Sequence, residues 1–233
     1  MRLASMAAAL AAVIVTSLPS AAENVGQATR VQRFAYQTPP QAQRVPVFRM
    51  NPVARNSRLE TVPSGALEVT FTDGSRLTLG SASSIVVDNY VFASRQGTGQ
   101  QTLKMTKGLF RFVSGSMPKD QVRLVTPTVS IGIRGTVVKV RVNESGSGTV
   151  FFEHGSGFIQ NAAGQNTPMS EGDLVKIGAD GSITPPAKQA WSTGDTAVDQ
   201  GLNPFNQAFG GADGGSGGGD GAGSSGGSRS NGL

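Results

Sequence analysis

Few side chains in this chain could perform nucleophilic or acid–base catalysis. His154 is the only histidine among the 233 residues, and there is no cysteine. A hydrolytic triad built on Ser75 or Ser156 would need an imidazole that a carboxylate orients. His154, however, precedes Gly155, Ser156 and Gly157 in a pattern typical of a hairpin turn. The sequence therefore predicts a solvated turn histidine and no catalytic residue.

Ligands for metals and cofactors are equally scarce. One histidine without cysteine cannot supply the nitrogen and sulfur ligands of a zinc site. Calcium could bind Asp73, Asp180 and turn carbonyl groups, but the spacing of a calcium-binding loop is absent. The sequence has no glycine-rich phosphate-binding loop in front of a helix. A glycosidase needs two carboxylates at a set distance, which a sequence does not give, so that class stays open. We expect no cofactor, no metal and no enzymatic activity, with a secreted all-β hydrolase as a distant alternative.

The clearest pattern lies in residues 126–142. Pro127 cannot donate to a sheet and holds Thr126 extended. On both sides of Gly135, apolar residues then alternate with polar ones, which indicates half-buried strands. We predict one long strand bent at Gly135, or two strands joined there, with another backbone approaching this glycine closely. For Arg134 we expect an ion pair within the domain, the alternative being a contact with a partner. The alternating apolar residues are Val129, Ile131, Ile133, Val138, Val140 and Val142.

The second marked element is the turn Asp73-Gly74-Ser75 between alternating runs at 67–71 and 76–79. Asp-Gly tolerates the positive φ of a tight hairpin, and the aspartate can cap its own backbone. Further short runs follow at regular spacing, which predicts an all-β fold: a single antiparallel sandwich or roll of about ten short strands. These runs are residues 84–87, 102–105, 109–113, 122–125, 149–153, 157–160, 174–177 and 182–184.

The N-terminus has the features of a secretory signal peptide. Arg2 precedes an apolar run at residues 7–18, and small residues precede a cleavage site after Ala22. The run is shorter than a spanning helix needs, so a retained anchor is the lesser alternative. We expect residues 1–22 to be removed and the mature chain to be periplasmic or secreted, in a Gram-negative type of envelope, with no transmembrane segment left. Without cysteine, its stability must come from packing alone.

Positive charge is concentrated near the start of the mature chain. The formal net charge is +5, and Glu23 is the only acid before residue 59. Arginines without interleaved aromatic residues are a weak signal for nucleic acid, which we do not expect as a partner. They fit attraction to an anionic surface or polymer. The arginines are Arg30, Arg33, Arg44, Arg49, Arg55 and Arg58.

Composition divides the mature chain into four parts. Residues 23–58 are rich in Pro and Arg, and we expect edge strands there with a loop around 37–44. Residues 59–186 carry the regular strand pattern and form the predicted β domain. Residues 187–209 are mostly polar with a few aromatic residues and give no clear structural signal. Residues 210–233 are dominated by Gly and Ser, which predicts a disordered tail.

Four segments together resemble a known family over roughly residues 60–180. They are Phe71–Gly80, Lys107–Phe112, Thr126–Thr136 and Glu171–Val175. The most specific element is Arg-Gly-Thr at 134–136 following Thr-Pro at 126–127. The combination is similar to the FecR domain of bacterial envelope proteins.

This resemblance implies an extracytoplasmic β-rich domain without enzymatic activity. The best-understood FecR proteins couple an outer-membrane transporter to an anti-sigma segment across the inner membrane, in iron-siderophore signalling. We expect neither that segment nor a spanning helix here. The expected function is therefore a protein-binding or signalling-accessory module with an envelope protein as partner; the alternative is a structural module that binds glycan or an anionic polymer. The residues that we expect to form its structural motifs are Asp73, Gly74, Ser75, Thr126, Pro127, Arg134, Gly135 and Thr136.

Overall fold

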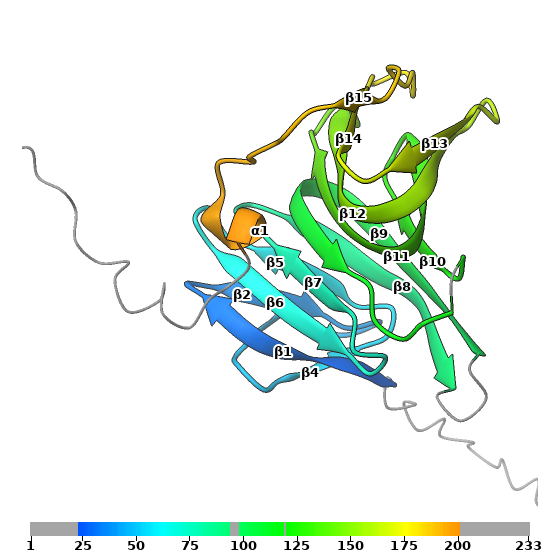
Figure 1. Ribbon diagram of the computed structural model, residues 1–233. Coiled ribbons are helices and arrows are strands. Elements are labelled where there is room, and N and C mark those ends of the chain that lie inside the picture. Colours follow the sequence, from blue (N-terminus) through cyan, green and yellow to red (C-terminus); the bar gives the residue numbers. More distant parts are fainter. Residues whose placement is uncertain (1–22, 94–97, 119, 201–233) are drawn as a thin grey trace, which may run out of the picture. The chain divides into compact units, whose positions relative to one another are not determined.

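The computed structural model describes residues 23–93, 98–118 and 120–200. The expected signal peptide, the Gly/Ser-rich tail and the end of the 187–209 segment lie outside these residues. Within them the fold is all-β, as predicted, with fifteen strands in one mixed sheet and one short helix, α1 (Thr196–Gln200) (Figure 1). No helix in the described part is long and apolar enough to cross a membrane.

The strands continue through several positions that the sequence pattern marks as breaks. Three of them, β9, β11 and β12, have 14 to 16 residues, so the strands are longer and more numerous than the ten short ones expected. All pairings are antiparallel except that between β9 and β10. The strands are β1 (Asn24–Gln32), β2 (Ala35–Thr38), β3 (Val45–Pro46), β4 (Pro52–Ala54), β5 (Arg58–Thr61), β6 (Ala66–Phe71), β7 (Arg76–Leu79), β8 (Ser84–Ala93), β9 (Thr98–Val113), β10 (Val122–Val125), β11 (Val129–Val142), β12 (Gly148–Asn161), β13 (Asn166–Ser170), β14 (Asp173–Ile177) and β15 (Ala187–Lys188).

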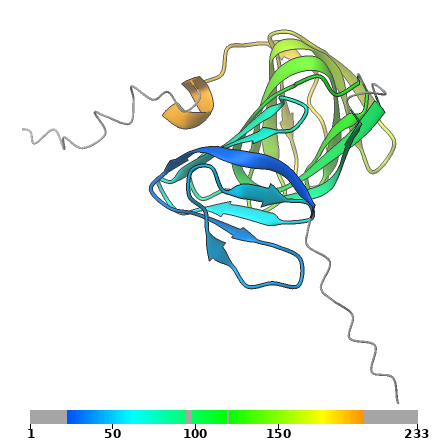
Figure 2. The ribbon, with the colours of Figure 1, turned by 90° about the horizontal axis from the view of Figure 1, so that it is seen from below.

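One apolar core runs through the sheet from β1 to β14. Its largest fully buried side chains include Phe110, Phe112 and Phe152, each of which contributes about 2 to 3 kcal/mol by burial. Strand β1 pairs with β6 on one side and β4 on the other, and in Figure 2 its blue ribbon lies beside the cyan strands that follow. The Pro/Arg-rich N-terminal segment is therefore built into the same sheet and core.

The central stretch forms one strand, β11, which bends where its register with β12 shifts, between Arg134 and Val137. Gly135 has a φ of 59° and supplies the bend, but a Cβ placed on it would meet nothing within 4 Å. The close backbone approach that we expected at Gly135 belongs instead to Gly155 on β12, where a Cβ would lie 2.3 Å from the carbonyl oxygen of Gly135. Gly155 needs its own positive φ of 82° as well.

The hairpin turn predicted at residues 154–157 is wrong, because these residues lie inside β12 and pair with β11 and β13. Two glycines in four residues look like a turn, but here they accommodate the bulge of the neighbouring strand. His154 is accordingly a strand residue. Its ring is exposed, and Nδ1 lies 3.5 Å from Oε1 of Glu171.

Candidate protein-docking site

The structure brings two of the sequence motifs together at residues 114–116, which follow β9. On one side, the Thr136 amide donates to the Ser114 hydroxyl at 2.7 Å, and the Ser114 amide donates to the Thr136 carbonyl at 3.0 Å. On the other side, the amide and the hydroxyl of Ser116 both donate to the Asp73 carbonyl at 2.8 Å. Gly115 lies so close to the Asp-Gly-Ser turn that a Cβ on it would be 2.3 Å from the Ser75 amide nitrogen. The Asp-Gly-Ser turn and the Gly-Thr bend are thus joined through one short segment.

The carboxylate of this turn points inward. Asp73 is 4% exposed, and its Oδ1 accepts hydrogen bonds from the Ser75 hydroxyl at 2.6 Å, the Ser75 amide at 3.1 Å and the Tyr90 hydroxyl at 3.1 Å. Gly74 provides the positive φ of 80° that the turn requires. Burial raises the pKa of Tyr90 to about 12; a hydrogen bond with Thr72 opposes this shift, and the Asp73 charge adds to it. These groups are packed inside the domain, where a partner does not reach them.

The remaining motif residues lie apart from this junction. The Thr126 hydroxyl accepts a hydrogen bond from the Val129 amide at 3.1 Å, which closes the turn that Pro127 begins between β10 and β11. Arg134 is exposed and forms an ion pair with Asp120. The motif residues therefore do not converge on a single surface site.

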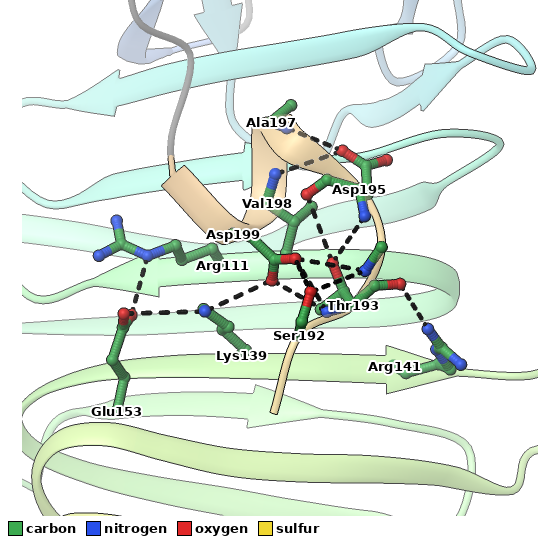
Figure 3. Close-up of polar contacts among 11 residues, drawn as sticks. Arg111, Lys139, Arg141, Glu153, Ser192, Thr193, Asp195, Ala197, Val198 and Asp199 are labelled. Atoms are coloured by element: carbon green, nitrogen blue, oxygen red, sulfur yellow. Dashed lines mark hydrogen bonds and ion pairs between the residues drawn. The ribbon is translucent and has the colours of Figure 1, made fainter. Parts of the chain in front are cut away.

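A surface site lies instead where the chain returns to the sheet after β15. Residues 191–200, here called the C-terminal strap, include α1 and pack on the outer face of the sheet at β7, β9 and β11 (Figure 3). Val198 is 0% exposed, and Ala197 packs against Ala66 of β6. At Gly80 a Cβ would lie 2.7 Å from the Val198 side chain. The sheet thus leaves room for the strap at the point where its apolar residues dock.

Asp195 both starts the helix and attaches it. Its Oδ1 accepts hydrogen bonds from the amides of Ala197 at 3.0 Å and Val198 at 3.3 Å, which caps the first turn of α1. Its Oδ2 accepts a hydrogen bond from the Ser81 amide at 2.8 Å. One carboxylate therefore satisfies amides of both the strap and the sheet.

The second anchor is an ion network. Lys139 lies on β11 between Val138 and Val140, which point into the core, so its side chain points to the outer face. There Nζ lies 3.4 Å from Oδ1 of Asp199 and 3.7 Å from Oε1 of Glu153. The other Glu153 oxygen pairs with the guanidinium of Arg111 on β9 at 3.1 Å. Lys139 is only 5% exposed, because it lies between the strap and its neighbours Arg111 and Phe151 on β9 and β12.

Hydrogen bonds within the strap shape the carboxylate that meets this lysine. Asp199 accepts from the Thr193 amide at 3.0 Å and from the Ser192 hydroxyl at 2.7 Å. Burial alone would raise the pKa of the Asp199 carboxyl, but hydrogen bonds from Thr193 and Ser192 and the nearby ammonium group hold it below its usual value. The strap therefore presents a charged carboxylate to the sheet at neutral pH.

Arg141, two residues along β11, holds the start of the strap. Its guanidinium donates to the Thr193 carbonyl at 2.9 Å and lies 5.5 Å from the centroid of the Trp191 ring. This cation–π contact and hydrogen bond extend the anchored stretch from α1 back to Trp191.

Sequence reasoning missed this site. The signals were present but weak: Asp195 and Asp199 stand four residues apart in a segment otherwise poor in charge, and Lys139 and Arg141 occupy the outer positions of β11. Only the fold shows that these two pairs, more than fifty residues apart in the chain, lie against each other.

Comparisons with known proteins relate part of the chain to a family. Residues 57–156 match the family model described as FecR protein. No curated protein matches the chain. Two crystal structures of a candidate anti-sigma factor from Parabacteroides distasonis are similar at 12% and 13% identity, with TM-scores of 0.46 and 0.45. Each comparison covers 57% of this chain and 59% of the other, so this chain spans about three fifths of their length.

The sheet residues that hold the strap, from Gly80 to Glu153, all fall within the matched range, whereas the strap itself lies beyond it. The range also contains the Asp-Gly-Ser turn and the Arg-Gly-Thr element on which the sequence resemblance was based. The chain therefore carries a FecR domain at residues 57–156, as three of its four motifs predicted; the fourth, Glu171–Val175, lies beyond the match.

Proposed function

We propose that this protein is a non-enzymatic protein-binding module of the bacterial envelope, and that the outer face of its FecR domain is the docking face. One observation carries the proposal: this face already binds a peptide segment that lies outside the matched domain. The bound segment packs on Gly80 and is held by the backbone amide of Ser81 and by the side chains of Lys139 and Arg141.

The strap indicates the chemistry of a partner. Beneath the strap, the outer face presents the cations of Arg111, Lys139 and Arg141 with the carboxylate of Glu153. Glu68, farther across the same face on β6, is paired with Arg30. An acidic segment can make charge-assisted hydrogen bonds with these cations, and a small apolar residue fits where Val198 now packs. The expected partner is an envelope protein with a short acidic segment of this kind, which replaces the strap.

The location in the envelope rests on the FecR domain and on the signal-peptide pattern of residues 1–22. N-terminal sequencing of protein recovered from the periplasm or the medium is expected to begin at Glu23. Recovery of a chain that begins at Met1, in the membrane fraction, would refute this location.

Peptide binding to a strap-released protein tests the docking face. Val198→Asp in the full chain places a charge at a buried position next to Asp195 and is expected to release the strap. The probe is a labelled peptide of residues 191–200. It should bind Val198→Asp, and bind the parent at least tenfold more weakly, since the tethered strap competes at an effective concentration on the order of millimolar.

A second substitution in the Val198→Asp background assigns the binding to the outer face. Lys139→Met should abolish peptide binding, whereas Lys176→Met, which removes an exposed lysine from β14, should leave it unchanged. Thermal melting checks that each variant is folded. A folded, strap-released protein that does not bind the peptide, or that binds it equally well with Lys139→Met, would refute the proposal.

A further inference from the structure

An apolar groove lies at the opposite end of the chain from the strap, outside the matched FecR range. It has a volume of about 530 Å³ and is lined by residues 31, 33–36 and 46–49, which belong to β1, β2, β3 and their connections. Two phenylalanines, Phe34 and Phe48, line it together with Tyr36 and Pro46, and Arg33 and Arg49 stand beside them. We call this surface the aromatic groove.

The aromatic groove concentrates the exposed apolar surface of the protein. Phe34 is 65% exposed and Phe48 is 64% exposed, and Val45 and Met50 nearby are 44% and 57% exposed. Among the described residues, only Val91 is a further exposed large apolar side chain. Clustering of this kind, rather than scattering, marks a surface that binds a protein, a membrane or an apolar ligand.

The charge around the groove is mostly positive. Arg33 and Arg49 form no ion pair with any residue that the structure describes. Arg44 stacks on the Tyr36 ring at 3.4 Å and pairs with Glu60 at 3.1 Å. Farther along β1, Arg30 pairs with Glu68 at 3.8 Å. The sequence has no acid between Glu23 and Glu60, so two arginines at the groove are left to pair with an external anion.

The backbone next to the groove is poorly suited to receive a partner strand. Strand β3 lies at an edge of the sheet, but it has two residues, and one of them is Pro46, which has no amide hydrogen. Short edge strands with proline are a common protection against strand addition. Recognition at this surface therefore depends on side chains.

We propose that the aromatic groove docks on an anionic lipid surface. Phenylalanine, valine and methionine match the boundary between headgroups and acyl chains. Arginine forms bidentate hydrogen bonds with phosphate, and an anionic leaflet attracts basic residues. Phe34 and Phe48 insert into the apolar boundary, while Arg33 and Arg49 bind phosphate groups above it. This surface does not include the strap or the residues beneath it, so the two proposals can fail separately.

Co-sedimentation of the purified protein with vesicles tests the proposal. Binding is expected to vesicles of phosphatidylcholine with about one third phosphatidylglycerol and not to phosphatidylcholine alone. Phe48→Ser should weaken binding about tenfold through lost apolar insertion. Arg33→Gln and Arg49→Gln should each weaken it about fivefold through lost attraction.

Two control variants separate the groove from general stickiness and net charge. Val91→Ser removes an exposed apolar side chain from β8, and Arg76→Gln removes an exposed charge from β7; neither lines the groove. Both should bind vesicles like the parent. If Arg76→Gln weakens binding as much as Arg49→Gln does, the interaction depends on net charge and the proposal is overturned.

A fluorescent variant reports insertion directly. Phe48→Trp in a Trp191→Phe background has its only tryptophan at the groove, and brominated lipid should quench its emission when the protein binds. Absence of quenching on bound vesicles would overturn the insertion of this side chain. Binding to polyglutamate but not to vesicles would assign the groove to an acidic protein and likewise overturn the proposal.

Discussion

Val198→Ala tests whether the strap is a separable ligand of the FecR domain. Val198 is 0% exposed against the sheet, so the loss of two carbon atoms weakens docking by about 1.6 kcal/mol. Alanine is the better helix former by about 0.5 kcal/mol, which offsets part of this loss in α1. About 1 kcal/mol remains, and the opening equilibrium of the strap should rise about fivefold.

Amide hydrogen exchange measures this opening. The amides of Val198 and Asp199 donate to the Asp195 carbonyl at 3.1 and 2.9 Å, so they are protected only while the strap is ordered. In Val198→Ala they should exchange about fivefold faster.

The matched control is Val140→Ala, which removes the same atoms from the core face of β11. This substitution lowers the global free energy of unfolding. The core contacts of residue 140, however, stay intact when only the strap opens. The strap amides should therefore exchange at the parent rate in Val140→Ala, while core amides exchange faster. If Val140→Ala accelerates the strap amides as much as the core amides, the strap opens only when the whole domain unfolds, and exchange with a partner is refuted.

Three further predictions concern the bend, the buried tyrosine and the strap carboxylate. Gly135→Val should lower the free energy of unfolding by about 1 to 2 kcal/mol through its left-handed backbone alone. Gly155→Ala should cost more, because its Cβ would also lie 2.3 Å from a carbonyl oxygen; the reverse order in denaturant melts would contradict this account. The pKa of Tyr90, raised from 10.0 to about 12 in the folded state, predicts that its contribution to the free energy of unfolding is constant below pH 10. That contribution falls from pH 10 to 12, where the unfolded chain loses a proton that the folded chain keeps; an identical fall in Tyr90→Phe would refute it. The pKa of Asp199, lowered from 3.8, predicts that docking of the strap is fully present above pH 3.8 and is lost as pH falls below it; the emission of Trp191 should follow this release, and a change centred near neutral pH would contradict it.

The alternation of apolar residues was enough to predict the all-β class. One of the two alternatives for residues 126–142 was a continuous bent strand. This alternative followed from the apolar–polar alternation, which resumes after Gly135 at Val138 and Val140. The pattern did not locate the strand ends. A glycine at a bulge and a glycine in a hairpin have the same sequence signal, and only the partner strand decides between them, as Gly155 shows.

The role of individual residues was harder to predict. The close backbone contact expected at Gly135 on β11 is found at Gly155 on β12. These two glycines face each other, and the direction of the bulge decides which of them has no room for a Cβ. The aromatic groove was equally hidden, since the sequence of residues 23–58 does not tell an exposed phenylalanine from a buried one. The exposure of Phe34 and Phe48 follows from their places beside the short edge strand β3, which tertiary structure alone sets.

Lys139 explains how the strap can be both well ordered and replaceable. A lysine buried inside a domain could not lose its carboxylate without remaining as an unpaired charge away from water, which is strongly unfavourable. Lys139 instead lies on the outer face of β11, where the strap covers it together with Arg111 and Glu153 of the neighbouring strands, so departure of the strap opens its ammonium group to water. Removing the Asp199 carboxylate alone then costs more free energy than removing the whole strap. Lys139 would stay covered by the strap, and its remaining partner would be Glu153 at 3.7 Å. Loss of this one carboxylate, by substitution or by protonation, therefore favours release of the whole segment, which is the behaviour that a tethered ligand needs if an acidic partner is to take its place.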